Sequence, residues 1–355
     1  MKKFSAILSL VLVICLLAGC AGTPVVYYAD CTCPTEGGAT EPAQPDETKA
    51  PEVTAEGEVK TGLAIVTSMA ESVDGEAKYD VTIAAVNVDE NGVIVGCYLD
   101  SLGTSVKFGA DGVITTDVKA EILTKNELGD AYGMKAYGGA TYEWYEQAAA
   151  LANFAVGKTV EEFRAGAVNE SGKANDADLA TTATIYLGGY VAAIEKAVAN
   201  AQHLGAQSGD ELKLAITSSV DGSKNADAEN EGLCELYTSA VALTVKDGVI
   251  TSAMIDAVQG KVNFVVTGTI TTDLTAPFAT KNELGEGYGM KAWGGAIAEW
   301  NEQAASFAAY ITGKTAADVA GIAVDETTKP TDADLLTSVT IKIGDFQALI
   351  AKACN

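Results

Sequence analysis

The chain has 355 residues, 48% of them apolar, which is enough for two domains with buried cores and argues against gross disorder. Its charge is strongly acidic: 48 Asp and Glu stand against 23 Lys and Arg, and without Lys2 and Lys3 the balance is 21 − 48 = −27. This charge repels phosphate backbones and anionic lipid headgroups, so nucleic acid is a poor partner. The single histidine, His203, excludes a His-rich zinc site and a Ser-His-Asp triad repeated in two domains.

An export signal is predicted at residues 1–20. Lys2 and Lys3 precede an apolar run that is too short for a stable membrane span and ends in Leu17-Ala18-Gly19-Cys20. These last four residues resemble the lipobox of bacterial lipoprotein precursors. The resemblance implies cleavage before Cys20, acylation of its thiol and anchoring of the mature chain in a lipid bilayer, facing outside the cytoplasm. The alternative is an ordinary secretory signal that contains a chance cysteine.

Residues 21–59 are predicted to form a disordered tether. Five of the seven prolines lie there, together with Thr, Glu, Gly and Ala and little aliphatic content. Such a segment cannot bury enough apolar surface to offset the entropy lost on ordering, so we expect it to hold the folded part away from the lipid. Cys31 and Cys33 lie within it. Their spacing strains a disulfide and supplies only half of a zinc site, which favours an incidental pair over a redox or metal site.

An internal repeat organises the rest of the chain. From residue 91 to residue 196, adding 156 to the residue number aligns the first half with the second without a gap, so that residues 114–117 and 270–273 both read Ile-Thr-Thr-Asp. Solenoid repeats have 20–50 residues, so a period of about 150 is typical of a duplicated domain. We therefore predict two tandem repeat domains, at residues 60–205 and 210–355.

The first part of each repeat is predicted to form a β-hairpin. Residues 79–88 alternate between apolar and polar, residues 89–92 supply a turn, and residues 93–99 run back. Residues 236–255 repeat this pattern in the second copy.

Helices are predicted in the later part of each repeat. Apolar residues share one helical face over 142–156, and Thr159 with Glu162 forms a capping box that begins a short second helix. A β-prone stretch at 181–187 precedes a last helix at 189–202. Because strands come first and helices follow, the predicted fold class is α+β, with antiparallel β-hairpins followed by helices in each of two tandem copies.

One segment is retained between the copies more strongly than the rest. Residues 124–148 match residues 280–304 at 19 of 25 positions, with polar residues kept as strictly as apolar ones. In a structural interpretation, these polar residues cap and pair around a glycine-rich turn. In a ligand-binding interpretation, the Gly-Gly pair lets backbone N–H groups approach a ligand at a helix start, Lys135 adds charge, and Tyr137 or Trp293 provides a stacking surface. The candidate ligand-binding residues are Lys125, Asn126, Lys135, Gly138, Gly139 and Trp144, with Lys281, Asn282, Lys291, Gly294, Gly295 and Trp300 in the second copy.

A second resemblance concerns flavin. Asp-Gly-Val-Ile-Thr hairpins followed by helices, in an exported chain, resemble the bacterial FMN-binding domain family, whose members can hold FMN through a phosphoester to Thr in an Asp-x-x-Ser-Gly-Ala-Thr pattern. Gly139-Ala140-Thr141 matches the last three positions, which implies FMN as cofactor and Thr141 as its attachment point. The sequence departs from the pattern at Gly138 and Lys135, and Ile297 of the second copy has no hydroxyl to esterify.

The sequence pattern indicates neither a nucleophile positioned beside a base nor a metal site, so no enzymatic activity is predicted. The first hypothesis is a cell-envelope lipoprotein whose duplicated extracytoplasmic domains bind a small solute or an envelope component without catalysis. The alternatives are an FMN-carrying electron-transfer lipoprotein of the envelope, and a structural or adhesin-like surface protein.

Overall fold

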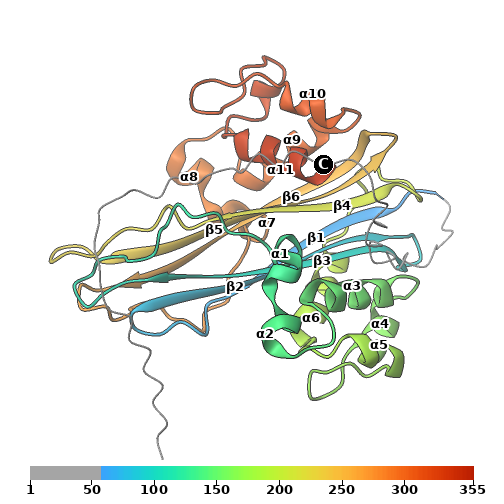
Figure 1. The fold of residues 1–355 in the computed structure, drawn as a ribbon. Coiled ribbons are helices and arrows are strands. Elements are labelled where there is room, and N and C mark those ends of the chain that lie inside the picture. Colours follow the sequence, from blue (N-terminus) through green and yellow to red (C-terminus); the bar gives the residue numbers. More distant parts are fainter. Residues whose placement is uncertain (1–56) are drawn as a thin grey trace, which may run out of the picture. The chain divides into compact units, whose positions relative to one another are not determined.

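The computed structural model describes residues 57–355. The predicted signal peptide, Cys20, Cys31, Cys33 and nearly all of the predicted tether lie outside the described residues. Within residues 57–355, two antiparallel sheets are each followed by helices (Figure 1). This arrangement confirms the predicted α+β class.

Each repeat begins with a three-stranded antiparallel sheet in which neighbours in the chain are neighbours in the sheet. The predicted hairpin of the first repeat is confirmed and extends from Glu76 opposite Lys107 to Val88 opposite Ile94. Residues 83–88 are buried on both faces, because each sheet is covered on both sides. The strands are β1 (Lys60–Ser68), β2 (Glu76–Val88) and β3 (Ile94–Lys107) in the first sheet, and β4 (Glu211–Ser219), β5 (Gly232–Lys246) and β6 (Val249–Phe264) in the second.

Helices occupy the later part of each repeat, as predicted. No described helix combines the length and the apolar character that crossing a bilayer requires. In the first repeat the helical segments are α1 (Lys125–Leu128), η1 (Gly129–Tyr132), α2 (Met134–Gly138), α3 (Trp144–Ala155), α4 (Val160–Ala167), α5 (Ala177–Thr182) and α6 (Gly188–Ala199). In the second they are α7 (Lys281–Leu284), η2 (Gly285–Tyr288), α8 (Met290–Gly294), α9 (Trp300–Ile311), α10 (Ala316–Ala320), η3 (Leu335–Thr337) and α11 (Gly344–Cys354).

The predicted capping box begins a helix, but the stretch predicted to be β-prone after it is not a strand. The Thr159–Glu162 capping box begins α4, as predicted. The β-prone stretch at 181–187 was a wrong prediction, since α5 includes Thr181 and Thr182 and the residues after them form no strand. The Asp176 side chain accepts the backbone N–H groups of Asp178 and Leu179. This N-cap stabilises a helical turn that overrides the β-propensity of the threonines.

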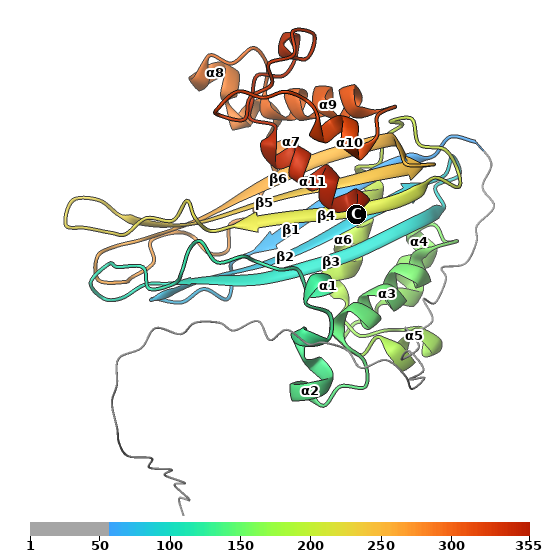
Figure 2. The ribbon, with the colours of Figure 1, turned by 45° about the horizontal axis from the view of Figure 1, so that its top comes forward.

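The two sheets pack face to face, and each carries its helices on its outer face (Figures 1 and 2). Between the sheets, Ile83 and Leu102 of the first belong to the same buried cluster as Leu236 and Val258 of the second. A second cluster joins the outer face of the first sheet to α3 and α6, and a third joins the outer face of the second sheet to α9 and α11. The described part is therefore built in four layers, with the helices of the two repeats on opposite sides.

Contacts between the repeats are reciprocal, as expected for an approximate two-fold relation. Lys196 of α6 reaches Glu283 of α7 (Nζ to Oε1, 2.7 Å), and the equivalent Lys352 of α11 reaches Glu127 of α1. Phe108 stacks on its own equivalent, Phe264, with ring centroids 3.8 Å apart. Each repeat thus contacts the other through the same surface.

Candidate functional site

The retained segment folds into α1, η1, α2 and the first turn of α3, and the candidate Asn126 fixes α1 to the sheet. Its backbone N–H donates to Asp100 Oδ1 (3.2 Å), and its Nδ2 donates to the carbonyl of Leu99 (3.0 Å). Asn282 makes the same two bonds, to Asp256 and Ile255, in the second repeat. Both asparagines therefore join helix to strand.

A buried carboxylate at the start of α3 binds backbone amides of α2. Glu143 is 1% exposed and accepts the backbone N–H groups of Met134 (2.7 Å) and Lys135 (2.9 Å) at the start of α2. It is also the N-cap of α3. Glu299 plays the same part in the second repeat. These amides are thus already bonded to carboxylates of the chain itself.

The lysines of the glycine-rich turn lie beside carboxylates. Lys135 Nζ is 3.0 Å from Glu146 Oε2 and 3.9 Å from Asp130 Oδ1. Lys291 Nζ is 3.3 Å from Glu302 Oε2. The hydrogen bond to Glu146 raises the pKa of Lys135, which therefore keeps its charge. Because these pairs are partly exposed, we expect them to contribute little to stability.

The candidates Lys125 and Lys281 sit against the candidate tryptophans. Lys125 Nζ lies 5.2 Å from the ring centre of Trp144. Lys281 is more enclosed: its Nζ lies 4.9 Å from the Trp300 ring centre and 2.9 Å from the Tyr237 hydroxyl. Burial lowers the pKa of Lys281 to about 8. Both lysines are held by cation–π contacts inside the repeat.

Two aromatic rings of the retained segment face solvent. Tyr137 is 91% exposed and Trp293 is 89% exposed, which makes them the most exposed large hydrophobic side chains of residues 57–355. They occupy equivalent positions on α2 and α8. Each ring lies over the glycine four residues before it, Gly133 or Gly289, where a Cβ atom would collide with the ring. Both glycines have φ of +81°, a conformation that glycine adopts readily.

The candidate glycines leave these rings uncovered. A Cβ atom added at Gly138, Gly139, Gly294 or Gly295 would have no neighbour within 4 Å. The surroundings of both rings are therefore open, apart from the glycine over which each ring lies.

Thr141, to which the flavin resemblance assigns an attachment role, is exposed in the turn between α2 and α3. Its equivalent, Ile297, is 56% exposed. Between residues 57 and 355, no group of three or more His, Cys, Asp or Glu is arranged to hold a metal ion. Comparison of the chain with protein-family models, with curated proteins and with solved structures finds no match.

The candidates of each repeat lie on or beside successive short helical segments, from α1 to α3 in the first repeat and from α7 to α9 in the second. Asn282 also lines a pocket of about 500 Å³ beside α9. Sequence reasoning did not identify two other residues of that pocket, Gln202 and Asn301. One signal was present: Asn301 stands where the first repeat has Tyr145, a change of size and polarity within the most strongly retained segment.

Proposed function

We propose that this chain is a cell-envelope lipoprotein, anchored through an acylated Cys20, whose two extracytoplasmic repeats bind an envelope component or a small solute without catalysis. One observation carries the proposal: each repeat presents one almost fully exposed aromatic ring, Tyr137 or Trp293, at the same place on a turn framed by glycines. The two rings are called the aromatic platforms below.

Exposed aromatic rings favour a binding role on energetic grounds. Tyrosine and tryptophan bury 150–250 Å² each on contact and dominate the energetics of binding surfaces. Contact of the ring with Gly133 or Gly289 restricts its directions before any partner arrives, so less side-chain entropy is lost on binding. The strongly retained carboxylate caps beneath serve the same end, since they hold the turn that carries the ring.

The position of the platforms supports two separate binding events. α2 and α8 lie on opposite sides of the paired sheets (Figures 1 and 2). A single flat surface cannot contact both rings at once. A polymeric or repeated component of the envelope would engage them independently, and the second contact would gain from the high effective concentration that the first creates.

Binding is tested by cosedimentation of the purified protein with envelope material isolated from the native host. The full chain carrying both Tyr137→Ala and Trp293→Ala is expected to bind at least about tenfold more weakly, as for the loss of two hot-spot aromatics. Each single variant is expected to lose part of the binding. Tyr186→Ala is the matched control, because Tyr186 is another exposed aromatic, 63% exposed, outside the platforms. Binding that survives the double substitution would contradict the assignment.

Anchoring is tested separately. In the native host, Cys20→Ser is expected to abolish incorporation of labelled fatty acid and to leave the precursor unprocessed. Mass spectrometry that finds a free thiol at Cys20 in the mature protein would refute the lipid anchor and leave the platforms untouched.

A further inference from the structure

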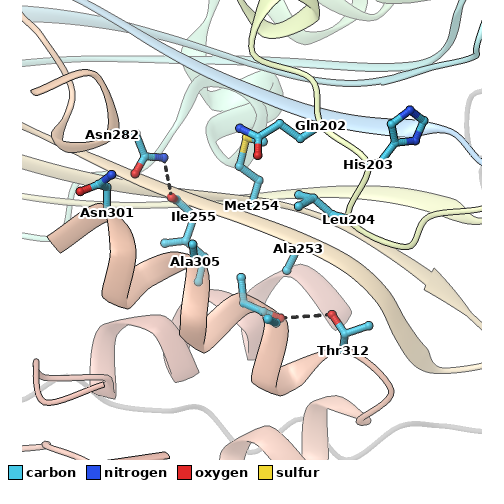
Figure 3. A pocket seen from close by; sticks show the side chains of 12 residues that line it. Gln202, His203, Leu204, Ala253, Met254, Ile255, Asn282, Asn301, Ala305 and Thr312 are labelled. Atoms are coloured by element: carbon cyan, nitrogen blue, oxygen red, sulfur yellow. Dashed lines mark hydrogen bonds between the residues drawn. The ribbon is translucent and has the colours of Figure 1, made fainter. Parts of the chain in front are cut away.

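A pocket between the second repeat and residues 202–204, at the end of the first, lies apart from the aromatic platforms. It is formed between α9, β6 and residues 202–204, which connect α6 to the second sheet, and has a volume of about 500 Å³ (Figure 3). This volume is in the range of sites that hold small molecules. Asn301 and Ala305 come from α9 and Thr312 follows that helix, whereas Asn282 comes from α7 and Gln202 from the connection (Figure 3).

The lining carries almost no charge, although the chain as a whole is strongly acidic. Its twelve residues, all within the described part of the chain, include no Lys, Arg, Asp or Glu. The one titratable group among them is His203, whose Nδ1 lies 3.4 Å from Glu58 Oε1. Nothing in the lining would compensate a ligand charge, and the pocket therefore suits an uncharged molecule.

Carboxamides supply the hydrogen-bonding groups of the pocket. Asn282 is fixed by the bond from its Nδ2 to the carbonyl of Ile255 (2.9 Å), which leaves its Oδ1 and second N–H for another partner. The Oδ1 of Asn301 is shielded from solvent and has no hydrogen-bond partner among residues 57–355. Asn301 is therefore a pocket-lining residue whose hydrogen-bonding capacity is not satisfied within residues 57–355.

We infer that this pocket binds a small, uncharged, planar heterocycle that carries a hydrogen-bond donor and acceptor side by side on one edge. Asn and Gln side chains recognise such an edge with paired bonds, as they do that of adenine. Met254, together with the alanines, supplies the apolar surface on which a flat ring can rest. This site goes beyond the proposed function and does not depend on the platforms.

The first repeat provides the design for a test. There, Tyr145 occupies the position of Asn301 and donates from its hydroxyl to Asp130. The substitution Asn301→Tyr therefore introduces a residue that the same fold accommodates, and it removes the Asn301 carboxamide from the pocket lining. Ala305→Leu narrows the pocket from the middle of α9 without removing a hydrogen-bonding group, and leucine is a good helix former.

The experiment is isothermal titration of the full-length protein with adenine, uracil and nicotinamide as probes. We expect at least one probe to bind, Asn301→Tyr and Ala305→Leu each to weaken that binding by about tenfold or more, and Tyr137→Ala to leave it unchanged. Thermal unfolding without probe shows whether each variant is folded. The inference is overturned if no probe binds the parent protein, or if both folded pocket variants bind as the parent does. Cosedimentation with envelope material should be unaffected by the pocket variants, so the two sites can fail separately.

Discussion

Lys281 is only 4% exposed and lies among the rings of Tyr237, Tyr288 and Trp300. Burial lowers its pKa from 10.5 to about 8. Between these two values the unfolded chain holds a proton that the folded protein has released, so the free energy of unfolding rises with pH. We expect this rise, about 3 kcal/mol for such a shift, to vanish in Lys281→Met. Urea unfolding between pH ~7 and ~10 measures it.

The control for this prediction is Lys125→Met in the first repeat. Lys125 makes comparable contacts with Tyr132 and Trp144 but is only half-buried. The variant Lys125→Met therefore shows the effect of losing the cation–π contacts at a lysine that is not deeply buried. Parallel pH profiles for the parent protein and Lys281→Met would contradict the prediction.

Asp100 and Asp256 have the opposite dependence on pH. Burial raises the pKa of each to about 6. Hydrogen bonds that the carboxylates accept, among them those from the backbone N–H groups of Asn126 and Asn282, act in the opposite direction and lower the pKa, but burial has the larger effect. Because the folded-state pKa exceeds the unfolded value of 3.8, their contribution to stability is complete below pH ~4 and is lost as pH rises through about 6. A variant carrying Asp100→Asn and Asp256→Asn should lack this decline, about 2–3 kcal/mol per carboxyl. Equal slopes for variant and parent in urea unfolding between pH ~4 and ~7 would show that the carboxyls are not responsible.

Within α2, substitutions of two glycines can test whether Gly133 orients the Tyr137 ring. Gly133 and Gly139 both have positive φ, 81° and 66°, so alanine strains the backbone at either position. Only at Gly133 would the new Cβ collide with the Tyr137 ring. We expect Gly133→Ala and Gly139→Ala to lose similar stability, about 1 kcal/mol. Only Gly133→Ala should change the near-ultraviolet circular dichroism of the ring and weaken the contribution of Tyr137 to envelope binding. Identical binding by the two variants would mean that ring orientation is unimportant.

Local signals were enough to predict most elements. The hairpin predicted from residues 79–99, the helix predicted from the apolar face of residues 142–156 and the Thr159–Glu162 capping box each depend on interactions within a few residues or within one hairpin, and each is confirmed. The predicted alternation holds only for residues 79–82, because residues 83–88 are buried on both faces of the sheet. The stretch at 181–187 was misjudged because one capping carboxylate, that of Asp176, outweighed the propensity of the threonines. Face-to-face packing of the sheets could not be predicted, since it depends on contacts between residues about 150 positions apart.

The position of the candidate site could be predicted from the sequence, but the contacts of its side chains could not. Polar residues retained in both copies marked residues 124–148, yet a retained glutamate has the same pattern whether it binds a ligand or caps a helix. In the structure, Glu143 bonds backbone amides and Gln147 accepts the N–H groups of Thr184 and Ile185. Exposure of Tyr137 and Trp293 could not be read from residue types, because an exposed and a buried aromatic look alike in a sequence.

At the scale of the described part as a whole, the two repeats behave like the subunits of a dimer joined by a connecting segment. Ile114 N–H donates to Asn225 Oδ1 and the equivalent Ile270 N–H donates to Asp74 Oδ1, both at 2.9 Å. Such reciprocity arises when one surface pairs with a copy of itself. The buried faces of the two sheets form one apolar cluster, so neither repeat alone could cover its inner face.

Cleavage of the connection tests this view. A protease site inserted between Ser208 and Gly209, where the chain turns at a solvent-exposed glycine, should give two fragments that elute together and unfold in one transition. Phe108→Ala with Phe264→Ala removes the buried stacked pair that joins the two repeats, at a cost of about 3–5 kcal/mol for each ring, and should let the cleaved fragments separate. Phe154→Ala, in the outer helix layer of the first repeat, is the control that should leave them associated. Fragments that separate on cleavage of the parent protein would show that the connecting segment, and not the shared core, holds the repeats together.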